Sequence, residues 1–355
     1  RRGNCHVRTK ERGNAVLKSL DESYYNSFFS HIYVEEEIAE HPRVKEILMR
    51  FEHAEVVYIR HYKDVFCRRR QDYDKQHHAQ NLILAKKTGN LIYQGAPVCQ
   101  NFGNTYFYYT SCMMNCIYDC EYCYLKGMYP SANIVIFVNI EDIFEELHQM
   151  LSEHPVYLCV SYDTDLLASE SVTGYVRAWE HFVLKENKIS PYPLKIEIRT
   201  KSANKKYFEN LIPDESIIYA FTLSPEHITK QYEHNTPSLL QRVSCVADAV
   251  KKGFPVRLCF DPMIYCPDWE QEYHEMLELV TKEVPMDQIF DVSVGSFRVS
   301  QDYLKKMRKN EPYSAVVQFP FQNDSGVYHY GKELTEQMES FLIRQLLEYV
   351  PEEKI

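Results

Sequence analysis

Apolar positions change their spacing along the chain, and the change separates a mixed N-terminal region from a long, regular one. In residues 28–87, runs such as HIYVEEE and VVYIRHY have strand character and flank HPRVKEILMRFEH, whose apolar residues recur at helical spacing. The apolar face of this expected helix carries Val44, Ile47, Leu48 and Phe51. We therefore predict a small N-terminal α/β domain at residues 26–95. A flexible leader is expected at residues 1–25, which lack apolar periodicity.

From residue 96 onward, short apolar runs alternate with amphipathic helical segments. The predicted strands are 104–109, 156–160, 195–199, 217–223, 256–260 and 289–294. The predicted helices between them are 140–152, 173–185, 203–210, 239–252 and 268–282. Such alternation predicts a parallel sheet with right-handed crossovers. Six β/α units are two fewer than a closed TIM barrel has, so residues 96–300 are predicted to form a partial (β/α)6 barrel.

The C-terminal region, residues 301–355, has a different pattern. The stretch VVQFPFQNDSGVYHYGKEL carries two strand-like runs around Asp324, Ser325 and Gly326, which is typical of a hairpin. Residues 334–349 then show helical periodicity. We expect a hairpin followed by a closing helix.

Four cysteines lie within twelve residues of the stretch SCMMNCIYDCEYCYLKGM. They are Cys112, Cys116, Cys120 and Cys123, and the last three are spaced C-x3-C-x2-C. Thiolates held this close in a loop can share one inorganic centre, and three ligands leave one iron of a four-iron cluster open. A closed zinc site usually takes two separated pairs of cysteines, and no second pair follows here. An iron–sulfur centre is the favoured interpretation, with zinc or disulfides as the alternatives.

Composition bears on the compartment and on the partner. The sequence has 355 residues, of which 45% are hydrophobic and 25% charged, and no apolar run is long enough to cross a bilayer. The basic start lacks the apolar stretch of a signal peptide, and eleven cysteines without such a signal indicate reduced thiols in a cytoplasm. The net charge of −10 argues against a DNA partner unless a local basic patch exists. Candidates for that patch are Arg68, Arg69, Arg70, Lys86, Lys87, Lys201, Lys205 and Lys206.

Polar residues follow the predicted barrel strands at 161–165, 200–202, 222–224 and Asp261. In barrels built from parallel strands, catalytic groups lie at the carboxyl ends of the strands. Helix capping is the alternative role for such residues. We expect these positions to share one face of the barrel.

The cysteine spacing resembles that of radical S-adenosylmethionine (SAM) enzymes. The turn CEYCYL, with Tyr122 and Tyr124 on either side of the last cysteine, is similar to the turn of the spore photoproduct lyase family. The resemblance extends over residues 95–350 and includes FTLSPEHITKQYEHNTPSLLQR and DPMIYCPDWEQEY. The matching positions in these two stretches are Tyr232, Glu233, Thr236, Arg242, Pro262 and Trp269.

This resemblance implies a DNA-repair lyase that reverts the spore photoproduct, 5-thyminyl-5,6-dihydrothymine, to two thymines through a 5′-deoxyadenosyl radical. It implies a [4Fe-4S] cluster on Cys116, Cys120 and Cys123, with Cys112 outside it. The implied SAM- or substrate-contacting residues are Tyr122, Thr164, Lys201, Thr222 and Asp261. The implied partners are ultraviolet-damaged DNA and an electron donor such as flavodoxin or ferredoxin, in the cytoplasm of a spore core or germinating cell.

Two departures from the family pattern affect the expected mechanism. Tyr162 stands where Bacillus-type members carry the cysteine that donates a hydrogen atom to the product radical, as in a clostridial-like variant. We expect Cys99 to be the donor, with Cys159 and Cys112 as the next choices, and Tyr122 or Tyr124 to return the radical to SAM. The family can also carry an arginine pair in the C-terminal hairpin, which this chain lacks. The DNA-binding candidates here are Arg298, Tyr328, Tyr330 and Lys332.

Two further functions stay open at the level of sequence. The loss of the strand-end cysteine allows a related radical SAM enzyme with a different substrate. The cysteine run alone also allows an iron–sulfur electron carrier or a zinc-stabilised binding module. Anaerobic purification distinguishes the metals, because an iron–sulfur protein is brown and a zinc protein is colourless.

Overall fold

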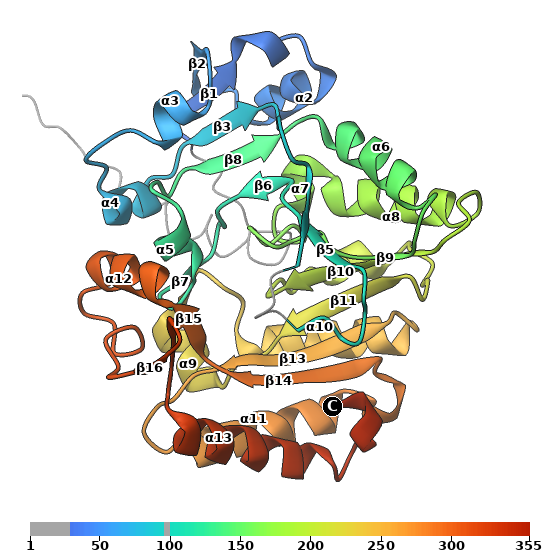
Figure 1. Ribbon diagram of the computed structural model, residues 1–355, viewed down its shortest axis with the longest axis vertical. Helices are drawn as coiled ribbons and strands as arrows, with labels where there is room; N and C mark the ends of the chain where they lie inside the picture. The colour runs from blue at the N-terminus through green and yellow to red at the C-terminus, as the bar shows by residue number, and fades with distance from the viewer. Residues whose placement is uncertain (1–28, 96–99) are drawn as a thin grey trace, which may run out of the picture.

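The computed structural model describes residues 29–95 and 100–355, which form a large sheet, a smaller sheet and the helices that cover them (Figure 1). The predicted leader at residues 1–25 and the predicted hydrogen donor Cys99 lie outside the described residues. Among the described residues, no helix has the length and apolar character needed to span a membrane.

The larger sheet is the predicted partial barrel. Its seven strands have the order β14-β13-β11-β10-β9-β5-β4, and the first six are parallel to their neighbours while β4 is antiparallel at the edge. The strands are β4 (Ile92–Gln94), β5 (Phe107–Thr110), β9 (Val156–Cys159), β10 (Leu194–Thr200), β11 (Ile217–Thr222), β13 (Val256–Met263) and β14 (Asp291–Ser296). Each of the six predicted strands overlaps one parallel strand, which confirms the fold class. Strand β4 was not predicted.

Amphipathic helices connect the barrel strands and pack their apolar faces on the sheet. They are α6 (Ile140–Met150), α7 (Glu170–Thr173), α8 (Tyr175–Glu186), α9 (Glu226–Tyr232), α10 (Leu239–Lys251) and α11 (Trp269–Glu283), with a short 3-10 helix, η2 (Lys205–Phe208). Helix α10 begins at a capping box, in which the Ser238 hydroxyl accepts from the Gln241 amide and the Gln241 side chain accepts from the Ser238 amide. It ends before Gly253, whose positive φ of 86° suits the turn into β13.

The smaller sheet has the order β2-β1-β3-β8-β6 and lies at the N-terminal side of the barrel (Figure 1). Its strands are β1 (His31–Glu35), β2 (Glu55–Ile59), β3 (Leu82–Ala85), β6 (Met113–Met114) and β8 (Ile134–Phe137), and its helices are η1 (Glu36–Ile38), α2 (Pro42–Arg50), α3 (Lys63–Phe66) and α4 (Tyr73–His78). The strands β6 and β8 come from beyond the expected domain boundary at residue 95. The sheet therefore holds both ends of the cysteine-rich loop, because β6 precedes most of this loop and β8 follows it.

The C-terminal region adds the predicted hairpin and helix. The hairpin strands β16 (Gln322–Asp324) and β17 (Val327–His329) pair with each other, and β17 also pairs with a third strand, β15 (Arg298–Ser300). Helix α12 (Gln301–Asn310), which was not predicted, packs against the short helix α5 (Leu125–Met128) of the cysteine-rich loop. Helix α13 (Lys332–Leu346) covers β14 and closes the fold, and the 3-10 helix η4 (Glu352–Lys354) follows it.

Candidate active site

The cysteine-rich loop leaves the carboxyl end of β5 and is held by hydrogen bonds on both sides. Asn115 adopts a left-handed conformation, with φ of 66°, and its amide donates to the carbonyls of Ser131 and Asn133 at 2.7 and 2.8 Å. Further on, the strand β7 (Asp119–Cys120) pairs with β12 (Glu233–His234). The loop is thus anchored to the rest of the fold before and after Cys116.

Three of the four cysteines come together with little solvent exposure, since Cys120 is buried and Cys116 and Cys123 are half-buried. Burial raises the pKa of Cys116, and the nearby thiols of Cys123 and Cys120 raise it further when they carry negative charge. Burial likewise raises the pKa of Cys120 to about 12 and also raises the pKa of Cys123. None of the three forms a disulfide. Buried thiols of this kind become thiolates only when a cation replaces the proton, which suits an iron–sulfur cluster.

The arrangement of the thiols also separates a cluster from a single ion. Among the described residues, no three potential metal-binding side chains come close enough together to hold one metal ion. Thiolates that bind different irons of a cluster stand farther apart than those around one tetrahedral zinc ion. With Cys112 turned into the core, the loop offers three cysteines, which is one ligand short of a closed four-cysteine zinc site and matches a three-cysteine cluster.

Cys112 lies apart from these three. It is buried in the hydrophobic core, and its sulfur accepts a hydrogen bond from the indole of Trp179 at 3.3 Å. Burial raises the pKa of its thiol to about 12. Its surroundings are those of a small core residue rather than of a ligand.

Glu233 connects the cysteine-rich loop to the barrel. Its carboxylate accepts hydrogen bonds from the Tyr122 phenol, from Ser224 at 2.8 Å and from Arg242 at 2.5 Å. Burial opposes ionisation, but Arg242 and Lys201 outweigh it and lower the pKa of Glu233 to about 2. The backbone of Glu233 pairs with Cys120, so this one residue holds the loop backbone through its main chain and the Tyr122 ring through its carboxylate.

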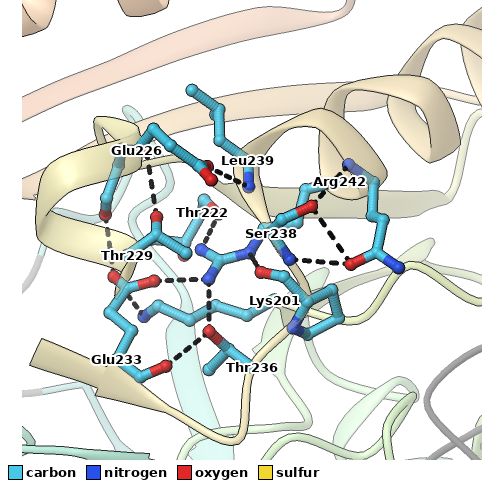
Figure 2. Close-up of polar contacts among 12 residues, drawn as sticks. Lys201, Thr222, Glu226, Thr229, Glu233, Thr236, Ser238, Leu239 and Arg242 are labelled. Atoms are coloured by element: carbon cyan, nitrogen blue, oxygen red, sulfur yellow. Dashed lines mark hydrogen bonds and ion pairs between the residues drawn. The ribbon is translucent and has the colours of Figure 1, made fainter. Parts of the chain in front are cut away.

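Arg242 completes this network from helix α10. Figure 2 shows its guanidinium between the Glu233 carboxylate, the Thr236 hydroxyl at 2.7 Å and the Thr222 carbonyl at 3.3 Å. The sequence resemblance marked Glu233, Thr236 and Arg242, but no role was assigned to them. A Glu and an Arg nine positions apart gave no local sign of an ion pair, because a strand-like turn and a helix start separate them.

Lys201 points from the carboxyl end of β10 toward the same carboxylate. Its ammonium lies 3.9 Å from Glu233 and 5.6 Å from the centroid of the Tyr122 ring. Burial works against its positive charge, but Glu233 and the Cys120 thiol raise the pKa of Lys201. The Asp165 carboxylate accepts from the Lys201 amide at 2.7 Å and from the Thr200 hydroxyl at 2.7 Å, which ties the end of β9 to the end of β10.

Two polar atoms beside β9 are buried without a hydrogen-bond partner among the described residues. They are the Thr164 hydroxyl and one carboxylate oxygen of Asp163. Buried polar atoms are normally paired, so these two need a partner such as a ligand or an ordered water. Thr164 and Lys201 follow neighbouring parallel strands, β9 and β10, and Thr222 is the last residue of β11. This arrangement fits SAM, whose amino and carboxylate groups need polar partners near the cluster.

Asp261 lies on β13 between two arginines. Its carboxylate is 3.5 Å from the Arg298 guanidinium and 4.0 Å from that of Arg199. Arg298 is therefore held at the barrel mouth, although its strand β15 belongs to the C-terminal sheet. The predicted cofactor residue and the predicted DNA-binding residue are direct neighbours.

The other DNA-binding candidates fall in different surroundings. Lys332 is 87% exposed in its side chain, and Tyr328 is half-buried with the Arg308 guanidinium 5.8 Å from its ring. Tyr330 is only 5% exposed, packs among Phe297, Phe319 and Phe321, and accepts a hydrogen bond from the Tyr265 amide at 3.0 Å. Such packing leaves no free face for a base, so we remove Tyr330 from the predicted interface.

Two residues of the expected basic patch point into the fold rather than into solvent. Lys87 is buried, and Lys201, with 17% of its side chain exposed, is turned toward Glu233. Burial lowers the pKa of Lys87, whose ammonium lies between the rings of Tyr93 and Phe137.

Tyr124 and Tyr162 are in contact. The Tyr124 phenol donates to the main-chain carbonyl of Tyr162, and the two ring centroids are 5.8 Å apart. The second-choice donor Cys159 is half-buried at the end of β9, where it stands opposite Tyr109 of β5 in the parallel register. The roles of these residues, like the role of Cys99, stay predictions.

Comparison with known proteins identifies one consistent family. A family model described as spore photoproduct lyase matches residues 28–355. Spore photoproduct lyase of Bacillus subtilis (strain 168) is 22% identical over 242 residues, which cover 66% of this chain and 69% of that protein. Spore photoproduct lyase of Clostridium acetobutylicum is 22% identical over 336 residues, which cover 90% of this chain and 96% of that protein.

Solved structures give the same fold. A double mutant of spore photoproduct lyase with bound AdoMet and dinucleoside spore photoproduct matches with a TM-score of 0.76 at 15% identity, covering 91% of this chain and 97% of that one. A spore photoproduct lyase complexed with dinucleoside spore photoproduct matches with a TM-score of 0.75 at 14% identity, covering 92% of this chain and 98% of that one. At this identity the likeness shows the fold, and the family model carries the assignment.

Proposed function

Because the chain belongs to the spore photoproduct lyase family, we propose that it is a radical SAM lyase that reverts the spore photoproduct in ultraviolet-damaged DNA to two thymines. The observation that carries the proposal is the convergence of Cys116, Cys120 and Cys123 at the carboxyl end of the barrel, in a chain that the family model matches over residues 28–355. The two curated relatives and the solved structures have the same name.

In this proposal, Cys116, Cys120 and Cys123 hold a [4Fe-4S] cluster, and Thr164, Lys201 and Thr222 contact SAM. When bound, cluster and SAM together supply the reactivity that removes a hydrogen atom from the lesion. The protein's own contribution is to hold the side chains around the cluster and SAM in position. Glu233 orients Tyr122 and Lys201 beside the cluster loop, and Asp165 fixes the backbone of Lys201. Because these groups are paired before any ligand arrives, little reorganisation accompanies binding.

The chain also has to end the reaction on the substrate. After the bridge between the two thymines breaks, a thymine-methyl radical remains and needs a hydrogen atom. We propose Cys99 as the donor, because Tyr162 occupies the position of the donor cysteine in Bacillus-type relatives. In this proposal Tyr124 takes part in returning the radical, which its contact with Tyr162 and its position next to Cys123 support.

DNA binding in this proposal uses a small cationic surface at the barrel mouth. Arg298 and Lys332 supply charge and the half-buried Tyr328 supplies an aromatic face. The lesion must leave the base stack to reach the site, and a weakly paired dimer lowers the cost of that movement. An electron donor of the flavodoxin or ferredoxin kind and a cytoplasmic location complete the proposal.

The test is anaerobic repair of a synthetic dinucleotide spore photoproduct by the reconstituted protein. We expect thymine dinucleotide to form with SAM and a reductant, and we expect none with Cys120→Ala under the same conditions. Cleavage of SAM without repair of the lesion would contradict the proposed substrate. The departure at Tyr162 favours one second candidate in that case, a radical SAM enzyme of the same family fold that acts on a different substrate.

A further inference from the structure

A row of four tyrosines leads from the cysteine-rich loop to the edge of the barrel. Tyr124 and Tyr162 have ring centroids 5.8 Å apart, Tyr162 and Tyr109 have theirs 4.2 Å apart, and Tyr109 and Tyr93 have theirs 5.2 Å apart. The last two contacts are stacked, with interplanar angles of 27° and 18°. Each ring is therefore in contact with the next, although the four residues come from separate segments of the chain.

The fold produces this row through strand pairing. Tyr93 on β4 stands directly opposite Tyr109 on β5 in the antiparallel register, so their side chains lie on one face of the sheet. Tyr162 comes just after β9, the parallel neighbour of β5 on the other side. The strand β4 is the edge of the seven-stranded sheet, so the row runs from the candidate site to the rim of the barrel.

The phenol oxygens distinguish this row from ordinary aromatic packing. All four rings are half-buried, and a Phe ring would pack equally well at each position. The Tyr124 phenol makes a hydrogen bond that Phe could not make, because it donates to the Tyr162 carbonyl. A carboxylate that can accept protons lies beside the row. The negative charge of Asp163 adds to the effect of burial in raising the pKa of both Tyr93 and Tyr124. One carboxylate oxygen of Asp163 has no hydrogen-bond partner among the described residues.

We propose that Tyr162, Tyr109 and Tyr93 form an outward radical-transfer chain that discharges the site when the thiol donor does not quench the product radical. This inference rests on the proposed function, which supplies the carbon-centred product radical. The Tyr162 or Tyr124 phenol gives a hydrogen atom to that carbon, which forms a C–H bond and leaves a tyrosyl radical. Tyr109 then gives an electron and a proton to the tyrosyl radical, and Tyr93 does the same for Tyr109.

A small soluble thiol completes the sequence at the sheet edge. It gives a hydrogen atom to the Tyr93 radical, which restores the phenol and leaves a thiyl radical, and two thiyl radicals combine to a disulfide. Each transfer between tyrosines exchanges one phenol for another, so no step between them is strongly uphill. This radical-transfer chain would protect the site from an unquenched radical, which otherwise attacks the protein or the product.

The experiment places 3-aminotyrosine, which is easier to oxidise than tyrosine and traps the radical, at position 93 of the full chain. In the reconstituted Cys99→Ala protein with SAM, reductant and the dinucleotide lesion, we expect the electron paramagnetic resonance signal of the aminotyrosyl radical. Tyr109→Phe should lose most of this signal. Tyr108→Phe is the matched control, because Tyr108 precedes Tyr109 on β5, points to the opposite face and stacks on His154.

A substrate-independent arm separates this inference from the proposed function. Azidyl radicals from pulse radiolysis oxidise tyrosines of the apoprotein, and the aminotyrosyl radical at position 93 should then grow more slowly in Tyr109→Phe than in Tyr108→Phe. Equal growth rates of the aminotyrosyl radical in the two variants would overturn the proposed radical-transfer chain. A turnover signal from aminotyrosine at position 124 with none at position 93 would also overturn it. Failure of lesion repair together with a growth difference would overturn the proposed function alone.

Discussion

The carboxylate of Glu233 and the guanidinium of Arg242 form an ion pair at 2.5 Å in which neither side chain is exposed. The pair lies between helix α10 and the cysteine-rich loop, because Glu233 also accepts from Tyr122 and pairs through its backbone with Cys120. A buried pair of this kind gains little over apolar packing, but the loss of one partner leaves a charge uncompensated. We expect its role here to be holding one geometry at the site.

Arg242→Met should lower the free energy of unfolding by about 3–5 kcal/mol, because the Glu233 carboxylate keeps its burial and loses its main counter-charge. Urea denaturation of the apoprotein measures this effect. Lys230→Ala is the control, since it breaks an exposed pair with Glu226 at 3.1 Å and should cost less than about 1 kcal/mol. Similar losses in the two variants would show that Glu233 finds another partner.

Single replacement of each of the four cysteines by Ala should distinguish Cys112 from the three proposed cluster ligands. Cys116→Ala, Cys120→Ala and Cys123→Ala should each lose bound iron and the visible absorption of the cluster. Cys112→Ala should keep both and lose some stability, because it removes a buried sulfur beside Trp179. Iron analysis after anaerobic reconstitution decides this, and a Cys120→Ala protein that retains its cluster would refute the assignment.

The hydrogen donor is tested by the products rather than by the rate alone. Cys99→Ala should still cleave SAM and break the bridge of the lesion, but should release aberrant products from the fraction of product radicals that the tyrosine row does not quench. Tyr162→Phe should have a milder effect. Chromatography of the dinucleotide products provides the measurement. Clean thymine repair by Cys99→Ala at the parent rate would transfer the proposal to Cys159, which stands opposite Tyr109 in the barrel.

Affinity for lesion DNA should fall with salt, because the net charge of −10 leaves binding to a local cationic surface. The slope of log affinity against log salt should be about −0.9 for each phosphate neutralised on duplex DNA. Arg298→Ala and Lys332→Ala should each make that slope shallower by about 1. Lys185→Ala on α8, on the far side of the barrel in Figure 1, is the control and should leave the slope unchanged. Affinity that does not respond to salt would exclude this surface.

Glu170 should make stability depend on pH. Burial raises the pKa of its carboxyl to about 7 from an ordinary value of 4.5, although the amides of Val176 and Arg177 donate to it. A carboxyl whose pKa is higher in the folded state binds its proton more tightly there. Its stabilising contribution is therefore complete below about pH 4.5 and is lost as the pH rises through about 7.

The loss amounts to about 3 kcal/mol by pH 8, and Glu170→Gln removes it. The difference in unfolding free energy between variant and parent should therefore shift by this amount in favour of the variant between pH 4.5 and pH 8. Urea denaturation of both proteins at the two pH values measures it. A difference that stays constant over this range would show that the Glu170 carboxyl titrates alike in the folded and unfolded chains.

Much of the fold followed from local pattern. The six parallel strands of the barrel and the helices α6, α8, α10 and α11 were predicted near their observed bounds, because periodicity reports which face of a segment is buried. The three candidate cluster cysteines were selected from their spacing and from the family resemblance, since ligands within one loop need no distant partner, and their ligation stays a prediction. The hairpin was recognised from its turn residues.

Other features depended on which segments become neighbours, and no local pattern encodes that. The strand β8 reads IVIF, a short apolar run, and only its pairing with β3 shows that it completes the N-terminal sheet. Tyr330 follows a hairpin strand, yet an aromatic cluster buries it. Glu233 meets Tyr122 across 111 positions, and the row from Tyr124 to Tyr93 forms only when β4, β5 and β9 lie side by side. Spacing along the chain determines contacts within one element, whereas contacts between elements depend on how the whole chain buries its apolar surface.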